Sequence, residues 1–234
     1  MAKNPQTEIV KNTVPVRNTM DWGKIYQDLE SYALVNQKKL TIIIGSILGA
    51  ILLFLAYIFL YQKPKEVDAK NQIFKAEQYY AEDSLDKALK GDGNNIGFES
   101  VESKFSGTEP GNLAHYYLGS IYLRKGEFQK AIDQLSDYNA KDDLTGSLSL
   151  GMIGDAYSEL NNFDKSLEYY HKAESFKPNN FTSPMFLMKE GLVLEKLNKN
   201  SEALEVYNRI KKDFNESSQA REIDKYIARV NQKI

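Results

Sequence analysis

The chain has 234 residues, of which 26% are charged, and its formal net charge at pH 7 is -2. A nucleic-acid binder needs a basic footprint, so this near-neutral composition predicts no nucleic-acid partner. The chain has no cysteine, which excludes disulfide frameworks, thiolate metal sites and cysteine nucleophiles.

The N-terminal region divides into two predicted parts. Residues 1–17 contain two prolines and few apolar side chains, so we expect a disordered tail. In residues 18–39 the spacing predicts a short amphipathic helix, with Asn18 and Asp21 as candidate caps. Its apolar face consists of Trp22, Ile25, Leu29 and Tyr32. This face would lie on a membrane surface or dock on a partner, or the helix would simply extend the segment that follows.

Residues 40–62 are uncharged and almost wholly apolar. About 20 apolar residues suffice to cross a hydrocarbon core roughly 30 Å thick. The run is too long for a signal-peptide core and lacks a small-residue cleavage pattern, so we predict an uncleaved transmembrane anchor in contact with lipid. Lysines flank it on both sides and leave its direction open.

Small residues in the first half of the predicted span indicate a helix-packing face. Gly45 and Gly49 are four residues apart, with Ser46 and Ala50 beside them. Such spacing lets two membrane helices approach closely. A homodimer through the span and contact with another membrane subunit are both open.

The polar region that follows repeats an internal pattern. Three glycines, Gly119, Gly154 and Gly191, are 35 and 37 residues apart. Twelve positions after each glycine comes a small residue: Ala131, Ser166 and Ala203. Sixteen positions after each glycine comes a large one: Leu135, Tyr170 and Tyr207. Small side chains permit two helices to cross closely, so we predict stacked helical hairpins in which the glycine and the small residue mark the crossing.

We expect this region to have three parts. Residues 63–111 form a long helix and a degenerate first repeat, with a turn at 91–95, a second helix from Phe98 and a loop at 106–111. Residues 112–216 form three repeats, and residues 217–234 form a capping helix. The offsets resemble those of the tetratricopeptide repeat, although Glu190 and Leu194 depart from its pattern in the third unit. The predicted fold is all-α: one transmembrane helix followed by a tetratricopeptide-repeat solenoid.

No catalytic or metal-binding constellation is visible. His115 and His171 lie in different repeats without ligand spacing, and phosphate-binding and nucleophile motifs are absent. We expect no enzyme, no cofactor and no metal.

A binding surface is the remaining candidate site. In this repeat class the first helix of each unit lines the concave face. The register places there Leu113, Tyr116, Ser120, Leu123, Arg124, Leu148, Asp155, Ser158, Glu159, Met185, Met188, Leu192, Glu195 and Lys196. Apolar residues, flexible methionines and both charge signs suit an extended peptide or a partner helix. Leu113, Met185 and Met188 are equally suited to the core.

The whole arrangement resembles the ancillary SecYEG translocon subunits (the YfgM-like family) in their Bacteroidetes form. The segments that carry the resemblance are 104–107, 111–114, 150–157 and 221–228. The resemblance implies a bacterial inner-membrane protein with a cytoplasmic tail and periplasmic repeats. It also implies two partners, SecYEG and a membrane-anchored periplasmic chaperone of the prolyl-isomerase class. The competing hypothesis is a scaffold of another envelope complex, for assembly or motility.

Overall fold

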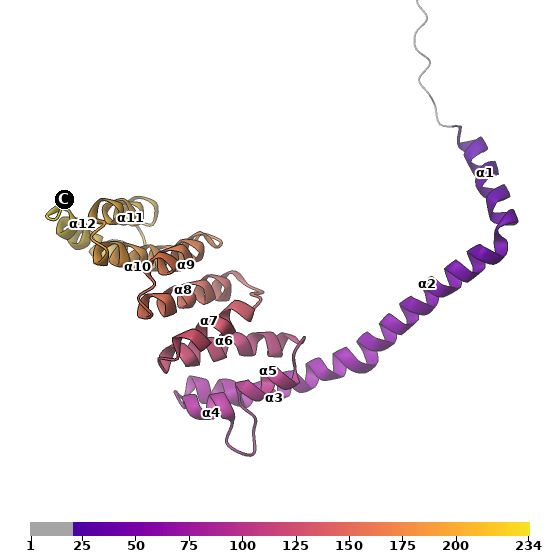
Figure 1. Ribbon diagram of the computed structural model, residues 1–234, viewed down its shortest axis with the longest axis horizontal. Helices are drawn as coiled ribbons and strands as arrows, with labels where there is room; N and C mark the ends of the chain where they lie inside the picture. The colour runs from indigo at the N-terminus through magenta and orange to yellow at the C-terminus, as the bar shows by residue number, and fades with distance from the viewer. Residues whose placement is uncertain (1–20) are drawn as a thin grey trace, which may run out of the picture. The chain divides into compact units, whose positions relative to one another are not determined.

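The computed structural model describes residues 21–234 (Figure 1). The predicted disordered tail and the candidate cap at Asn18 lie outside these residues. Within them the chain is helical and contains no strand, only an isolated bridge between Gly91 and Ile96. The predicted all-α class is confirmed. The chain forms two compact units, one up to Tyr57 and one from Ile58.

The first unit contains α1 (Trp22–Val35) and α2 (Gln37–Tyr57). The side chain of Asp21 caps α1 by accepting hydrogen bonds from the backbone N–H groups of Gly23 and Lys24, at 3.1 and 3.3 Å. The helix ends at Asn36, whose backbone N–H donates to the Tyr32 carbonyl at 3.0 Å. Residues 22–35 therefore form a helix of their own, interrupted at Asn36 before the apolar segment begins.

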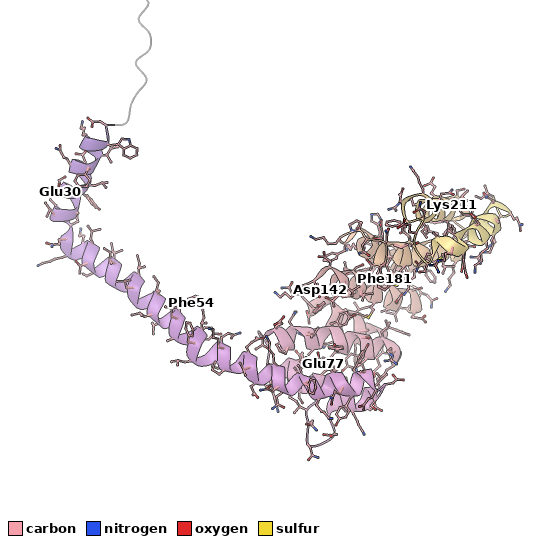
Figure 2. All side chains as sticks on the ribbon, turned by 180° about the vertical axis from the view of Figure 1, so that it is seen from behind. Glu30, Phe54, Glu77, Asp142, Phe181 and Lys211 are labelled. Atoms are coloured by element: carbon pink, nitrogen blue, oxygen red, sulfur yellow. The ribbon has the colours of Figure 1, made fainter. Side chains whose placement is uncertain are left out.

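One helical stretch among residues 21–234, Gln37–Ala81, is long and apolar enough to cross a membrane. It comprises α2, a π-helical turn η1 (Ile58–Gln62) and α3 (Lys63–Ala81). Apolar side chains surround α2, and Phe54, labelled in Figure 2, is one of those that are exposed. The sequence prediction of a single such helix is confirmed.

The second unit continues from α3 as a series of helices that pack in chain order. They are α4 (Leu85–Lys90), α5 (Phe98–Lys104), α6 (Glu109–Arg124), α7 (Phe128–Asp137), α8 (Asp143–Glu159), α9 (Phe163–Ser175), α10 (Thr182–Lys196), α11 (Asn200–Asp213), η2 (Ala220–Glu222) and α12 (Ile223–Asn231). The three predicted repeats are the pairs α6/α7, α8/α9 and α10/α11 (Figure 1).

The turns of four helical hairpins have the same backbone conformation. One residue of each turn has a left-handed backbone: Asp83, Gly126, Asn161 and Asn198, with φ of 59°, 76°, 57° and 59°. The next residue donates its N–H to the carbonyl five positions earlier; these bonds are Ser84 to Tyr79, Glu127 to Tyr122, Asn162 to Tyr157 and Lys199 to Leu194. Glycine, asparagine and aspartate tolerate this conformation best. The turn between α3 and α4 therefore belongs to a repeat like the other three.

The first repeat is degenerate because a loop interrupts its second helix. Ala76 and Ala88 are both fully buried and stand 12 residues apart, as Gly119 and Ala131 do. Helix α4 then stops at Lys90, and residues 91–97 connect it to α5. The helix from Phe98 was predicted, but α4 was not.

The predicted loop at 106–111 is shorter than expected, because α6 already begins at Glu109. Thr108 caps it by accepting a hydrogen bond from the backbone N–H of Gly111 at 3.1 Å.

The predicted glycine crossings are confirmed. A Cβ atom added at Gly154 would lie 2.7 Å from the Tyr170 ring. The equivalent distances are 2.3 Å from Gly119 to Leu135 and 2.3 Å from Gly191 to Tyr207. The small residues Ala131, Ser166 and Ala203 are fully buried. At the C-terminal end, α12 buries Ile223 and Val230 against the last hairpin; this helix covers Ile223–Asn231, within the segment 217–234 that was predicted as a cap.

Substitution of Gly154 by alanine tests this crossing. We expect Gly154→Ala to lower the free energy of unfolding by about 1–3 kcal/mol, because the new methyl group overlaps the buried Tyr170 ring. Urea unfolding of the full chain in detergent, followed by far-UV circular dichroism, measures the loss. Ser158→Ala on the same helix is the control and should change stability by less than about 0.5 kcal/mol. Equal effects of the two substitutions would contradict the crossing.

Candidate functional site: the concave face of the repeats

The candidate site is the inner face formed by the first helices of successive repeats. Helices α3, α6, α8 and α10 contact one another in this order. The second helix of each repeat, from α4/α5 to α11, packs against the opposite side of the first helix. The helices that form the inner face are therefore fixed by packing. Side chains on this face come from each repeat at the same helical register.

Tyrosines dominate the face where α3, α6 and the start of α8 meet. Ring centroids lie 5.0 Å apart for Tyr80 and Tyr117, and 5.4 Å apart for Tyr116 and Tyr138. Burial raises the pKa of Tyr116 and of Tyr117 to about 12, so both rings are neutral at physiological pH. Tyr116 was predicted here; Tyr80, Tyr117 and Tyr138 were not.

Ser120 is not part of an open surface, in contrast to the prediction. It is only 8% exposed, and its hydroxyl shares a hydrogen bond of 2.7 Å with the Tyr80 hydroxyl. The reason is that α3 packs directly over this position of α6. Arg124 stays exposed but pairs with Asp83, and its guanidinium lies 5.9 Å from the Tyr80 ring centroid.

Asp155 ties the second repeat to the third. Both of its carboxylate oxygens lie 2.6 Å from Nζ of Lys189 on α10. The Tyr170 hydroxyl also donates to this carboxylate, at 2.7 Å. A partly buried carboxylate with three such bonds is held in one orientation. Asp155 was predicted to lie on the concave face, but the sequence did not identify Lys189 or Tyr170 as its partners.

Glu195 faces the C-terminal cap, and its predicted place in an open groove is wrong. Its side chain is 9% exposed, and it accepts hydrogen bonds from Tyr207 at 2.8 Å and from Arg229 Nε at 2.9 Å. Burial alone would raise the pKa of Glu195, but hydrogen bonds from Arg229, Tyr207 and Lys233 outweigh it and lower that pKa. Helix α12 covers this position, which periodicity within α10 cannot reveal.

The other predicted residues divide by exposure. Five apolar residues are half-buried and belong to the core clusters between repeats: Leu113, Leu123, Leu148, Met185 and Met188. Ser158 is half-buried, and Glu159 and Lys196 are exposed. Leu192 is 42% exposed. The accessible part of the face therefore lies near the C-terminal ends of α6, α8 and α10.

The predicted contact residues of the first unit are uncovered within that unit. The apolar face of α1 formed by Trp22, Ile25, Leu29 and Tyr32 is exposed. A Cβ atom added at Gly45 or Gly49 would meet no atom within 4 Å, and Ser46 and Ala50 are exposed. Membrane contact by α1 and helix packing by the glycines stay predictions.

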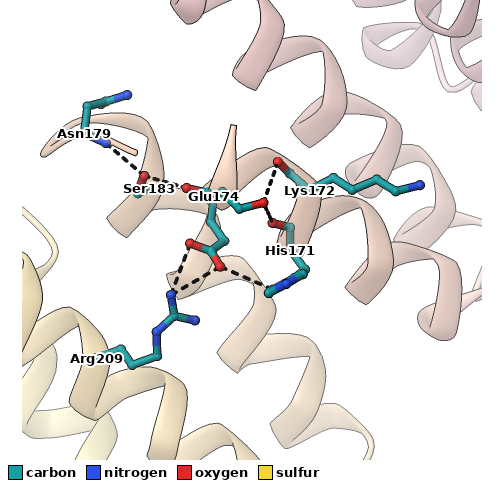
Figure 3. A network of polar contacts seen from close by, with 7 residues as sticks. His171, Lys172, Glu174, Asn179, Ser183 and Arg209 are labelled. Carbon is teal, nitrogen blue, oxygen red and sulfur yellow. Dashed lines mark hydrogen bonds and ion pairs between the residues drawn. The ribbon is translucent and has the colours of Figure 1, made fainter. Parts of the chain in front are cut away.

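A polar network joins α9, α10 and α11 on another side of the repeats (Figure 3). The buried carboxylate of Glu174 accepts from Arg209 Nη2 at 3.3 Å and lies 3.2 Å from Nδ1 of His171. The Ser183 hydroxyl donates to the Glu174 carbonyl at 2.7 Å. The His171 side chain is otherwise solvent-exposed. Sequence patterns did not predict this network, because its members come from three helices.

Glu190 is the unusual member of this region. It occupies the register of Leu118 and Ile153, which are core residues in the preceding repeats. Its Oε2 atom is buried without a hydrogen-bond partner. Burial raises the pKa of Glu190 to about 7; the neighbouring Glu174 adds to this effect, whereas His171 and Arg209 oppose it.

The described residues offer little other evidence of a catalytic or metal-binding site. No group of three or more histidine, aspartate or glutamate side chains between residues 21 and 234 could hold a metal ion. Nδ1 of His115 lies 2.8 Å from Oε1 of Gln134, so this ring is engaged in a contact between α6 and α7.

Comparison with known proteins supports the repeat assignment. The tetratricopeptide repeat profile matches residues 148–180, which include most of α8 and all of α9. No curated protein matches the chain. The chain thus contains a tetratricopeptide repeat within a helical-repeat solenoid, a fold that typically serves as a non-enzymatic scaffold for protein interactions.

Glu190→Gln tests the buried carboxyl. A carboxyl whose pKa is higher in the folded state than its ordinary value of 4.5 stabilises the fold while it is protonated, and this contribution is lost as pH rises toward 7. We therefore expect wild type and Glu190→Gln to have similar stability at pH 5. At pH 8 the variant should be more stable, by up to about 3 kcal/mol.

Urea unfolding of both full-length proteins in detergent at the two pH values measures this difference. Glu205→Gln, at an exposed position of α11, is the matched control and should show the wild-type pH dependence. A constant difference between wild type and Glu190→Gln at pH 5 and pH 8 would contradict the raised pKa.

Proposed function

We propose that this chain is a membrane-anchored, non-enzymatic protein-interaction module that binds a peptide or a partner helix on its concave face. The observation that carries the proposal is the surface near the C-terminal ends of α6, α8 and α10. Arg124, Glu159, Leu192 and Lys196 are exposed there on helices whose backs are fixed by packing. Such mixed apolar and charged surfaces on rigid helices suit binding without large rearrangement.

The proposed anchor is the apolar segment within Gln37–Ala81. Its length and composition support insertion in a bilayer, and the aromatic residues Tyr57, Phe59 and Tyr61 suit its interface. We place the protein in the bacterial inner membrane, with the N-terminus in the cytoplasm and the repeats in the periplasm. This localisation and orientation rest on the family resemblance.

The more specific proposal is an accessory subunit of the Sec translocon. The resemblance to ancillary SecYEG subunits supports it, and so does the combination of one apolar helix with a tetratricopeptide repeat. The concave face would recruit a membrane-anchored prolyl-isomerase-class chaperone or contact emerging chains. The partners would thus be SecYEG and this chaperone.

Affinity purification of the full chain from mildly solubilised membranes, followed by mass spectrometry, tests the translocon proposal. We expect SecY or a periplasmic isomerase to be recovered at near-stoichiometric amounts. Consistent recovery of another envelope complex without either protein would replace the translocon with the scaffold alternative.

Substitutions on the accessible inner surface test the binding face. We expect Glu159→Ala and Leu192→Ala each to weaken the recovered partner's binding by about 5- to 30-fold, as truncation of an interface anchor does. Both side chains are exposed, so helicity measured by circular dichroism should not change. Glu205→Ala on α11 is the control, and equal binding by all three variants would place the site elsewhere.

Protease added to spheroplasts tests the orientation. The repeats after residue 62 should be digested while an epitope on the N-terminal tail is protected, because only the periplasmic side is accessible. Digestion of the tail with protection of the repeats would reverse the proposed topology.

A further inference from the structure

The loops that connect successive repeats lie together at one edge of the second unit. In a hairpin the second helix ends near the place where the first begins, so each connecting loop returns the chain to the same edge. Figure 1 shows these loops on the side from which α3 enters the unit. We call this surface the loop edge; it consists of the loops 105–108, 138–142 and 176–181 and the first turns of the helices that follow them, α6, α8 and α10.

Hydrogen bonds fix the first of these loops beside the residues at which the apolar segment ends. The Gln62 side chain donates to the Gly107 carbonyl at 2.9 Å, and the Lys65 ammonium donates to the Ser106 carbonyl at 2.8 Å. Gln62 is the last residue of the predicted span, and Lys63 is the first charged residue after it. The loop edge therefore starts at the level where the chain leaves the apolar segment.

The next two loops are joined to the first one along the edge. Near the start of α6 the side chain of Asn112 exchanges two hydrogen bonds, each of 2.8 Å, with the backbone of Asn139 in the second loop. The third loop packs on the start of α8, because a Cβ atom added at Gly146 would lie 2.2 Å from the Phe176 ring. The loop edge is therefore one continuous surface.

Two large apolar side chains are exposed side by side on the loop edge. Phe181 is 66% exposed and Leu144 is 48% exposed. Phe181 is thus at least as exposed as Phe54 of the predicted span, at 63%. Both side chains line one hollow of about 560 Å³, together with Asp143, Lys177, Pro178 and Asn179. Neighbouring apolar side chains with a polar rim form a candidate contact surface.

A lysine precedes each of these two apolar residues. Lys141 and Lys177 are exposed, and a long lysine side chain can lay its stem on hydrocarbon while its ammonium stays among lipid headgroups. The apolar segment ends in a similar way, because the Lys63 ammonium lies 4.2 Å from the Phe59 ring centroid. Large apolar residues flanked by lysines are typical of segments that lie on a membrane surface.

The charges of the loop edge nearly balance, so electrostatic attraction to anionic lipid is not its main contact. Its acidic residues are Glu109, Asp142 and Asp143. Glu109 pairs with Lys70 at 3.2 Å, and Asp142 caps α8 by accepting from the backbone N–H of Leu144 at 3.0 Å. Asp143 is exposed and limits insertion to headgroup depth, because a carboxylate in hydrocarbon is costly.

The position and the size of this surface favour lipid as its occupant. In an anchored chain the loop edge starts where the chain leaves the bilayer. A stable protein interface buries about 800 Å² on each partner, which two side chains do not supply. Contact with lipid needs much less, because the anchor holds the loop edge at a high effective concentration beside the bilayer.

We propose that the loop edge docks on the headgroup region of the bilayer, with Phe181 and Leu144 inserted. This inference rests on the proposed membrane anchoring. Docking would hold the N-terminal ends of α6, α8 and α10 at the membrane and turn their C-terminal ends toward solvent. Glu159, Leu192 and Lys196 are exposed near those C-terminal ends, so the proposed partner-binding surface would stay accessible.

Tryptophan fluorescence in lipid vesicles tests the docking. Trp22 is the only tryptophan of the chain, so Phe181→Trp in a Trp22→Phe background carries a single reporter. The full chain is reconstituted in vesicles of phosphatidylethanolamine and phosphatidylglycerol, with part of the lipid brominated on its acyl chains. We expect the reporter at position 181 to emit at shorter wavelength than in free solvent and to be quenched by the bromine.

Leu160→Trp in the same Trp22→Phe background is the matched control. Leu160 is 44% exposed and follows α8 at its C-terminal end, on the edge opposite to the connecting loops. Its reporter should stay unquenched. Equal quenching at positions 160 and 181, or no quenching at position 181, would overturn the proposal.

A charge placed in the surface tests insertion directly. Leu144→Glu added to the reporter at position 181 should weaken docking by about 3- to 10-fold, seen as a loss of quenching, because it replaces an inserted side chain with a carboxylate. Leu160→Glu should leave the quenching unchanged, and circular dichroism checks that both variants are folded. High salt should have little effect; a salt-dependent loss of quenching would overturn insertion and assign the contact to the lysines.

Two further results separate the docking from other occupants and from the anchor. Emission at shorter wavelength without bromine quenching would overturn lipid as the occupant, because protein would then cover position 181. Carbonate extraction followed by flotation of the vesicles tests anchoring independently. Anchored protein without quenching would refute only the docking, whereas extractable protein that was quenched before extraction would refute the anchor and keep the docking.

Discussion

The close crossing of the two helices within each hairpin is the constraint on which this solenoid depends. At Gly119, Gly154 and Gly191 the absence of a side chain lets a large residue of the second helix lie directly against the first. In the second and third repeats that residue is a tyrosine, and its ring passes behind the first helix. The Tyr170 hydroxyl thereby reaches Asp155, and the Tyr207 hydroxyl reaches Glu195.

The same crossing organises the inner face. Each tyrosine donates a hydrogen bond to a carboxylate of the first helix, and this carboxylate also binds a cation of a later helix. Lys189 binds Asp155, and Arg229 binds Glu195. These bonds join successive repeats as well as orienting the side chains. A surface fixed in this way loses little conformational entropy when a partner binds, which favours recognition by the exposed residues near the C-terminal ends of the helices.

The two ends of the solenoid differ in whether the apolar surface of the terminal repeat is covered. Helix α12 covers the last repeat with Ile223 and Val230, as repeat architectures generally require. The first repeat leaves Val67 and Phe74 exposed on α3.

Local sequence patterns determined the helical repeats, the glycine crossings, the C-terminal cap and the apolar helix, because each depends on spacing within one or two helices. The first repeat was only partly predicted, since residues 91–97 interrupt the periodicity of its second helix. The tertiary structure alone decided which polar residues of the first helices face solvent. Ser120 bonds to Tyr80, Glu195 bonds to Arg229, and the half-buried Glu190 lies near Glu174. Helical periodicity gives the side of a helix on which a residue lies, but the helix that covers that side belongs to another part of the chain.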